Sequence, residues 1–143
     1  EDLPGHIKHE QLGLEPVTSV SKRFKIDAYT TKLSLAVCKN HLLVHRVFEL
    51  KSSTILKLMK ELNAFRQGDL FNDALICCYA DSVGRANPIV YKDYPQKEFL
   101  VLIKKELDKV DTSDLVATHD GKKLGQLIDE RQILKIKELK AKL

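Results

Sequence analysis

Apolar residues recur at helical spacing along nearly the whole chain. The clearest case is the segment 54–66, TILKLMKELNAFR, in which apolar residues at intervals of three and four form one stripe: Ile55, Leu58, Met59, Leu62 and Phe65. No segment alternates apolar and polar residues as a half-buried strand does, and no Asn-Gly or Asp-Gly hairpin joins two such segments. The pattern therefore predicts an all-α fold, a multi-helix bundle.

Caps and breakers divide the first half of this pattern. We expect a helix over 9–24 whose start is weakened by Gly13 and Pro16, and a second helix capped by Asp27 that runs to Val37. The segment 41–50 is expected to form a turn or two. A further helix begins at a serine cap, Ser52 or Ser53, and Gly68 is expected to end it.

The second half of the chain divides in the same way. Asp69 is expected to cap a helix that extends to Arg85, and Pro95 to begin the next one, because proline suits a first helical position. The rest reads as a short turn-rich piece and a long basic helix. We therefore expect a body over residues 1–94 and a helical tail over residues 95–143, packed together.

Composition limits the class of protein. Of the 143 residues 43% are hydrophobic and 31% charged, a balance typical of a soluble globular domain. No apolar run approaches the roughly 20 residues that span a bilayer. The three cysteines show no CxxC spacing, which favours reduced, mostly buried thiols in the cytoplasm. Since the chain opens in a loop without methionine, we expect it to be a C-terminal piece of a longer protein.

The net charge of +4 is unevenly distributed. Residues 122–143 hold seven lysines and arginines against three acids, so they carry all of it, and residues 1–121 are balanced. A cationic tail on a neutral body indicates a polyanionic partner. A solvated lysine-rich helix would have the same composition, and this alternative stays open.

Two histidine pairs are candidate ligands. His6 and His9 are three residues apart, and His41 and His45 are four apart, with Arg46 beside them. Either spacing places two imidazoles on one side of a helix, but two ligands do not complete a metal site. Exposed loop histidines in the first pair, and hydrogen-bonded core histidines in the second, are the alternatives.

Asp81 interrupts the apolar run ICCYADSVGR. It could face solvent near the end of a helix and pair with Arg85 at i+4, an interaction worth only tenths of a kcal/mol. Alternatively it is a metal ligand. Tyr94-Pro95-Gln96 by itself predicts only a turn that opens a helix. The chain has no dinucleotide or Walker loop, no HExxH, no nucleophile elbow and no DxD pair of carboxylates.

Six stretches occur in an order that resembles a known family. They are HIKHEQLG, NHLLVHR, FELKSSTILKLMKELNAFR, CCYADSVGR, DYPQ and GKKLGQLIDE. Together they resemble the C-terminal region of the bacterial class II CCA-adding enzymes, the tRNA nucleotidyltransferases, and more closely the subgroup with an HD phosphohydrolase domain. The resemblance covers nearly the whole chain.

The resemblance implies a division of labour. The family's N-terminal head holds the catalytic carboxylates, works with Mg²⁺ and selects CTP and ATP, and nothing here matches it. This chain alone is therefore expected not to add nucleotides. Its share would be tRNA binding together with an incomplete HD phosphohydrolase module, in which a divalent transition metal activates water.

Within that module the resemblance assigns three candidate metal ligands. His9 matches the histidine of a Gly-His-Glu motif, His41 the second member of a His-His pair, and Asp81 a late aspartate in an Ala-Asp motif. Two departures follow. The His-Asp doublet would lie upstream of Glu1, and Asn40 stands where the family often has histidine. We therefore expect no tightly bound metal in this chain.

The resemblance also gives the basic tail a role. In the family the C-terminal helices hold the acceptor and TΨC arms of tRNA, and contacts of this kind are electrostatic. The candidate RNA-binding residues are Lys122, Lys123, Arg131, Lys135 and Lys137. Two other functions stay open: a free-standing HD-type phosphohydrolase, and a non-catalytic helical module that binds protein.

Overall fold

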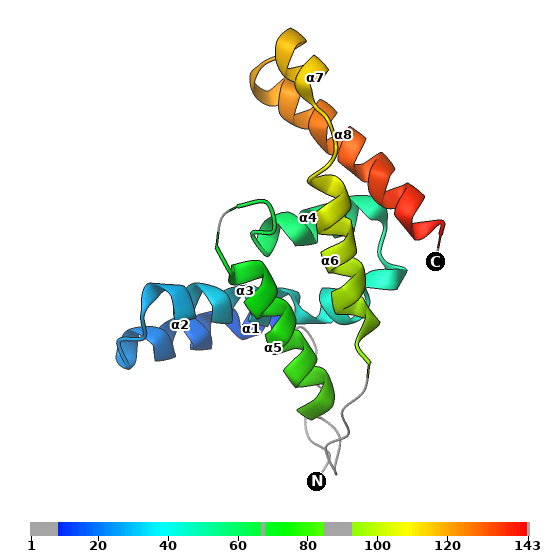
Figure 1. Cartoon of the computed structure of the whole chain (residues 1–143). Coiled ribbons are helices and arrows are strands. Elements are labelled where there is room, and N and C mark those ends of the chain that lie inside the picture. The colour runs from blue at the N-terminus through cyan, green and yellow to red at the C-terminus, as the bar shows by residue number, and fades with distance from the viewer. Residues whose placement is uncertain (1–8, 67, 85–92, 143) are drawn as a thin grey trace.

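The structure is a computed structural model that describes residues 9–66, 68–84 and 93–142, and the side chain of residue 9 is outside that description. Every element is a helix, as Figure 1 shows, and the described residues contain no strand. The all-α prediction is confirmed. The elements are α1 (His9–Leu12), α2 (Leu14–Arg23), α3 (Ala28–His45), the 3₁₀ helix η1 (Val47–Glu49), α4 (Ser52–Glu61), α5 (Leu70–Gly84), α6 (Pro95–Leu107), α7 (Ser113–Thr118) and α8 (Gly121–Lys140).

Helix α3 is the element around which the others pack. It contacts α1, α2 and α5, and also α4 and α6. On the other side of the molecule α8 packs against α4, α6 and α7. In Figure 1 the α2–α3 pair extends to the left, while α7 and the beginning of α8 project from the top. The two ends of the molecule are therefore formed by different helix pairs.

The hydrophobic core lies between the end of α3 and helices α4, α5, α6 and α8. Its largest fully buried apolar side chains are Val44, Val47, Ile55, Leu58, Met59, Leu62, Leu75, Leu100, Ile103 and Ile136. Residues before and after position 94 share this one cluster. The division into a body, 1–94, and a tail, 95–143, stays a prediction, but the two parts are packed on each other.

Helix α3 is longer than the sequence pattern predicts. Asp27 caps it as expected, its Oδ1 accepting the N–H of Thr30 at 2.9 Å. The side chain of Thr30, and then this N–H group, lower the pKa of the Asp27 carboxyl. The separate segment expected over 41–50 is wrong, because the helix continues to His45. No glycine or proline interrupts residues 28–45, so nothing stops its propagation.

Helix α4 is shorter than expected. It ends at Glu61, and Asn63 adopts the left-handed conformation with φ of 64°. The N–H of Asn63 donates to Lys60 O at 3.0 Å and that of Ala64 to Met59 O at 2.9 Å, the two bonds of a Schellman motif. The prediction that Gly68 ends this helix is therefore wrong. The serine cap is also wrong, because Lys51 occupies the cap position without a side-chain hydrogen bond.

The single helix expected over 9–24 is wrong, because the chain turns at Gly13 and forms α1 and α2. Pro95 is the first residue of α6, as expected. The short α7 and the long α8 follow as expected. None of the described helices combines the length and the apolar character needed to cross a membrane.

We expect Ile136→Ala to loosen α8 from the core. Ile136 is 0% exposed, whereas Leu134 on the same helix is 61% exposed. Truncation of a fully buried isoleucine costs about 2–5 kcal/mol of unfolding free energy, and truncation of an exposed leucine roughly 0.5 kcal/mol or less. Urea denaturation of both variants measures the difference. Equal losses would contradict the docking of α8 through Ile136.

Candidate functional site

A polar cluster joins α3, α5 and the start of α6. The imidazole of His45 lies between two partners: its Nε2 is 2.8 Å from Asp81 Oδ2, and its Nδ1 is 2.7 Å from the hydroxyl of Tyr94. A neutral ring satisfies both contacts, with Nε2–H donating to the carboxylate and the tyrosine O–H donating to Nδ1. His45 thus holds three helical segments together at one point.

This cluster gives Asp81 a partner on another helix. The carboxylate, 38% exposed, accepts a hydrogen bond from His45 of α3, and its role as a metal ligand stays a prediction. His45 therefore orients the Asp81 side chain. The pairing of Asp81 with Arg85 lies outside the described residues, and so does His6.

His41 lies one turn before His45. Its Nδ1 is 3.1 Å from the carbonyl oxygens of both Val37 and Cys38. Because carbonyls only accept, this nitrogen carries a proton. The ring centroids of His41 and His45 are 6.0 Å apart, so His41 neighbours the residue that holds Asp81.

The convergence of His9, His41 and Asp81 stays a prediction. His9 begins α1, which packs against α3, but its side chain is not described. Among residues 10–66, 68–84 and 93–142 no group of three or more His, Cys, Asp or Glu side chains is placed to hold a metal ion. The described residues by themselves therefore do not fit a divalent ion, and no catalytic step through a metal follows from them.

Two other residues near the end of α3 have local partners. Asn40, where the family often has histidine, is 1% exposed and donates from Nδ2 to Ala36 O at 3.0 Å. Arg46 pairs with Glu49, one of its terminal nitrogens lying 2.6 Å from Oε2. Arg46 thus has a local, solvent-exposed partner in η1.

Cys78 is a core thiol. Cys78 is buried, and this burial, with smaller contributions from Cys77 and Asp81, raises the pKa of its thiol to about 12. Cys38 and Cys77 are half-buried, and all three are free. A thiol with so high a pKa stays protonated and is therefore a poor nucleophile, as is usual for a cysteine buried in the core.

The basic residues predicted to bind RNA lie along α8 in different states. Lys122, Lys123 and Lys137 are exposed. Lys135 has a carboxylate near it, Glu138, at 3.6 Å. The charge of this helix is therefore not equally available to a partner.

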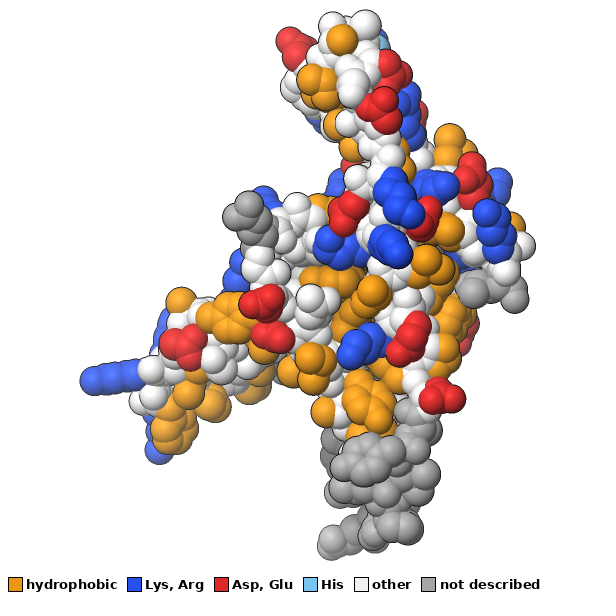
Figure 2. All heavy atoms as spheres, in the orientation of Figure 1, with side chains coloured by type: hydrophobic (Ala, Val, Ile, Leu, Met, Phe, Trp, Pro, Cys, Tyr) orange, Lys and Arg blue, Asp and Glu red, His pale blue; other side chains and the backbone are white. Residues whose placement is uncertain are grey.

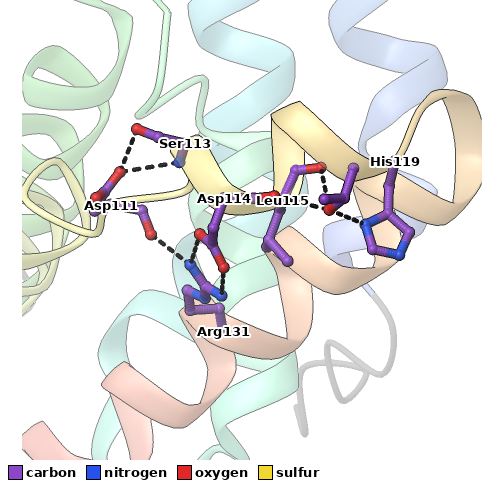
Figure 3. A network of polar contacts seen from close by, with 7 residues as sticks. Asp111, Ser113, Asp114, Leu115, His119 and Arg131 are labelled. Atoms are coloured by element: carbon purple, nitrogen blue, oxygen red, sulfur yellow. Dashed lines mark hydrogen bonds and ion pairs between the residues drawn. The ribbon is translucent and has the colours of Figure 1, made fainter.

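Arg131 is engaged within the protein, as Figure 3 shows. Its two terminal nitrogens lie 2.7 and 2.8 Å from the two carboxylate oxygens of Asp114 on α7, and one of them also donates to Asp111 O at 2.7 Å. Asp111 in turn accepts from the N–H of Ser113 at 2.9 Å. Arg131 thus fixes α7 on α8, a role that competes with phosphate binding.

Long-range interactions that fix α8 are not visible in the sequence. Lys60 Nζ lies 2.5 and 2.6 Å from the carboxylate oxygens of Asp129, 69 residues away, and Lys140 Nζ donates to Leu50 O. No periodicity of the sequence links residues so far apart.

Tyr94 was missed for the same reason, because the sequence around it indicates only a turn. The i, i+4 pair His41 and His45 does point to α3, the helix that carries the cluster of His45, Asp81 and Tyr94.

The contact of α7 with α8 is expected to weaken in acid. The hydrogen bond from Arg131 lowers the pKa of Asp114 from 3.8 to about 2, so the stabilisation is complete above about pH 4 and is lost as the pH falls towards 2. Amide exchange should show α7 losing protection in this range before α5 does. Asp114→Asn should remove that protection already at pH 5, and unchanged exchange in the variant would contradict the clamp.

We expect Tyr94→Phe to cost about 1 kcal/mol of unfolding free energy, because His45 then loses a buried donor. Tyr79→Phe is the matched control. Tyr79 packs on the Tyr94 ring at 5.8 Å, and its hydroxyl makes no hydrogen bond within the described part of the chain. Urea denaturation of the two variants compares them. A loss in Tyr79→Phe as large as that in Tyr94→Phe would refute the assignment.

Comparison with known proteins identifies relatives by sequence alone. No family model and no solved structure matches the chain. Curated relatives include the proteins named multifunctional CCA protein of Stenotrophomonas maltophilia (36% identical over 134 residues), Acinetobacter baylyi (34% over 138) and Haemophilus influenzae (32% over 139). These alignments cover 93%, 96% and 96% of this chain and 33% of each relative. The chain spans about one third of their length and is homologous to a one-third segment of bacterial multifunctional CCA proteins.

Proposed function

We propose that this chain is the helical C-terminal part of a CCA-adding tRNA nucleotidyltransferase and that it binds tRNA through α8. The observation that carries the proposal is the similarity of almost the whole chain to one third of proteins named multifunctional CCA protein. The exposed cations of α8 are the second support. As a tRNA-binding protein it would act in the cytoplasm.

Nucleotide addition belongs to another part of such an enzyme. The sequence has no DxD pair of carboxylates to hold Mg²⁺ ions. CTP, ATP and Mg²⁺ would bind to the head of the parent protein, and this chain would position the tRNA.

Three lysines are the best-placed phosphate ligands. Lys122 and Lys123 lie in the first turn of α8, which begins without a side-chain cap hydrogen bond, and Lys137 lies in its last turns. The N–H groups of an uncapped first turn add to the attraction for phosphate. Of the other two basic candidates, Lys135 shares its charge with Glu138 and Arg131 is held by Asp114, so we assign Arg131 to support α7.

A second proposal concerns the HD phosphohydrolase module. The hydrogen bond between His45 and Asp81 favours it, because it orients a carboxylate beside His45, whose ring lies 6.0 Å from that of His41. His41 and Asp81 would be the ligands that this chain contributes, with His9 as a third. His45 and Tyr94 would orient Asp81, and the remaining ligands would come from residues outside this chain.

The tRNA proposal is tested by charge reversal. The variant Lys122→Glu/Lys123→Glu/Lys137→Glu is compared with the control Lys51→Glu/Lys57→Glu/Lys105→Glu, which changes the net charge equally at other exposed positions. Fluorescence anisotropy with two unrelated tRNAs at several salt concentrations gives the affinities. Because the α8 variant removes three lysines that bind phosphate, its slope of log affinity against log salt should flatten by about two to three units, whereas that of the control should not.

Other outcomes are informative. Equal losses in the two variants would show that net charge alone attracts RNA, and the α8 assignment would be wrong. A large loss for one tRNA only would contradict phosphate binding, because phosphate contacts carry no base information.

A further inference from the structure

The turn between α2 and α3 is fixed from both sides. At the end of α2, the N–H of Ile26 donates to Ser21 O at 2.9 Å and that of Lys25 to Lys22 O at 3.3 Å, which together form a Schellman motif. At the start of α3, Asp27 caps the helix through Thr30. We call residues 22–26 the α2–α3 corner.

Lys25 occupies a position in the corner that suits glycine. Its φ is +51°, the left-handed region, which glycine adopts freely and a residue with a Cβ adopts at a cost. A side chain kept in an unfavourable backbone conformation points to a role for that side chain. The ammonium group of Lys25 is the feature that a glycine would not provide.

The corner also exposes apolar surface. Phe24 is 63% exposed and Ile26 41% exposed, although most phenylalanines of a small domain are buried. The guanidinium carbon of Arg23 lies 5.4 Å from the centroid of the Phe24 ring. A planar cation and an aromatic ring therefore lie together on the surface.

The cations of the corner are not used in ion pairs within the described part of the chain. No carboxylate there pairs with Lys22, Arg23 or Lys25, and the next acid in the sequence, Asp27, is used as a helix cap. Figure 2 shows basic side chains projecting from the outer end of the α2–α3 pair beside hydrophobic ones. This differs from α8, where Arg131 is bound to Asp114.

Exposed aromatic and planar cationic groups among lysines favour one kind of partner. Bases of single-stranded RNA stack on aromatic rings and guanidinium planes, while lysines attract the adjacent phosphates. An acidic peptide would use the cations but would leave the Phe24 ring without a purpose. The exposed apolar surface continues along α2 with Val20, which is 52% exposed, so lipid vesicles are included as a second ligand in the test.

We propose that the α2–α3 corner binds an unpaired stretch of RNA, with a base stacked on Phe24 and Arg23 and phosphates held by Lys22 and Lys25. This rests on the proposed function for the choice of RNA as partner. It is a different surface from α8, because α2 packs on α1 and α3 while α8 packs on α4, α6 and α7. The protein would then hold RNA at both ends of the molecule (Figure 1).

Two variants separate the roles of ring and charge. Phe24→Ala removes the stacking platform from an exposed position and should weaken binding of a fluorescent uridine decamer about tenfold. Phe65→Ala, at another partly exposed phenylalanine outside the corner, is the control and should leave the affinity unchanged. Lys25→Gly should raise the midpoint of thermal unfolding, because it relieves the left-handed backbone, while it flattens the salt slope by about 0.7 units.

Each alternative result identifies another explanation. If Phe24→Ala binds the decamer as tightly as the unchanged protein does, the proposal is wrong. If the same variant binds phosphatidylserine vesicles more weakly, the corner binds a membrane surface instead. Polyglutamate that binds as tightly as RNA, without an effect of Phe24→Ala, would show simple charge attraction and also overturn it. If tRNA affinity falls in the α8 variant but not in the corner variants, the corner proposal is wrong and the α8 proposal stands. If it falls in the corner variants but not in the α8 variant, the α8 proposal is wrong and the corner proposal stands.

Discussion

The packing of α3 is the constraint on which the other elements depend. It touches α1, α2, α4, α5 and α6, and its last turns enter the core through Val44. Because the helix continues through His41 to His45, both imidazoles have fixed positions relative to α5. A break after Val37 would have left the histidines in a loop, where neither the bond to Asp81 nor that to Tyr94 would be set by the fold.

Helical class and most helix starts could be predicted from the sequence because both are local properties. Period 3.6 identified the helices, and Asp27 and Pro95 marked where two of them begin. The end of α4 was misplaced because Asn63 supplies the left-handed residue that glycine usually supplies. The cluster around His45 could not be predicted in full, because Asp81 lies 36 residues and Tyr94 49 residues further along the chain than His45.

Net charge along the sequence is a poor guide to where this protein can attract a polyanion. All of the formal charge lies in residues 122–143, yet Arg131 there is bound to Asp114 and Lys140 donates to a backbone carbonyl. Residues 1–121 are neutral in sum, yet Lys22, Arg23 and Lys25 pair with no carboxylate within the described fold. The field that a ligand meets depends on pairing, and pairing is decided by tertiary structure.

The two proposed RNA surfaces place different demands on the fold. At the α8 end, the helix is held by interactions that use its own cations: Arg131 with Asp114, and Lys140 with the carbonyl oxygen of Leu50. At the α2–α3 corner, backbone hydrogen bonds and a cap fix the turn, so its cations are not consumed in building it. A corner fixed by its backbone keeps its whole charge for a ligand, whereas α8 divides its charge between its own structure and the RNA. On these proposals each cation of the α2–α3 corner therefore contributes more to RNA affinity, on average, than each cation of α8 does.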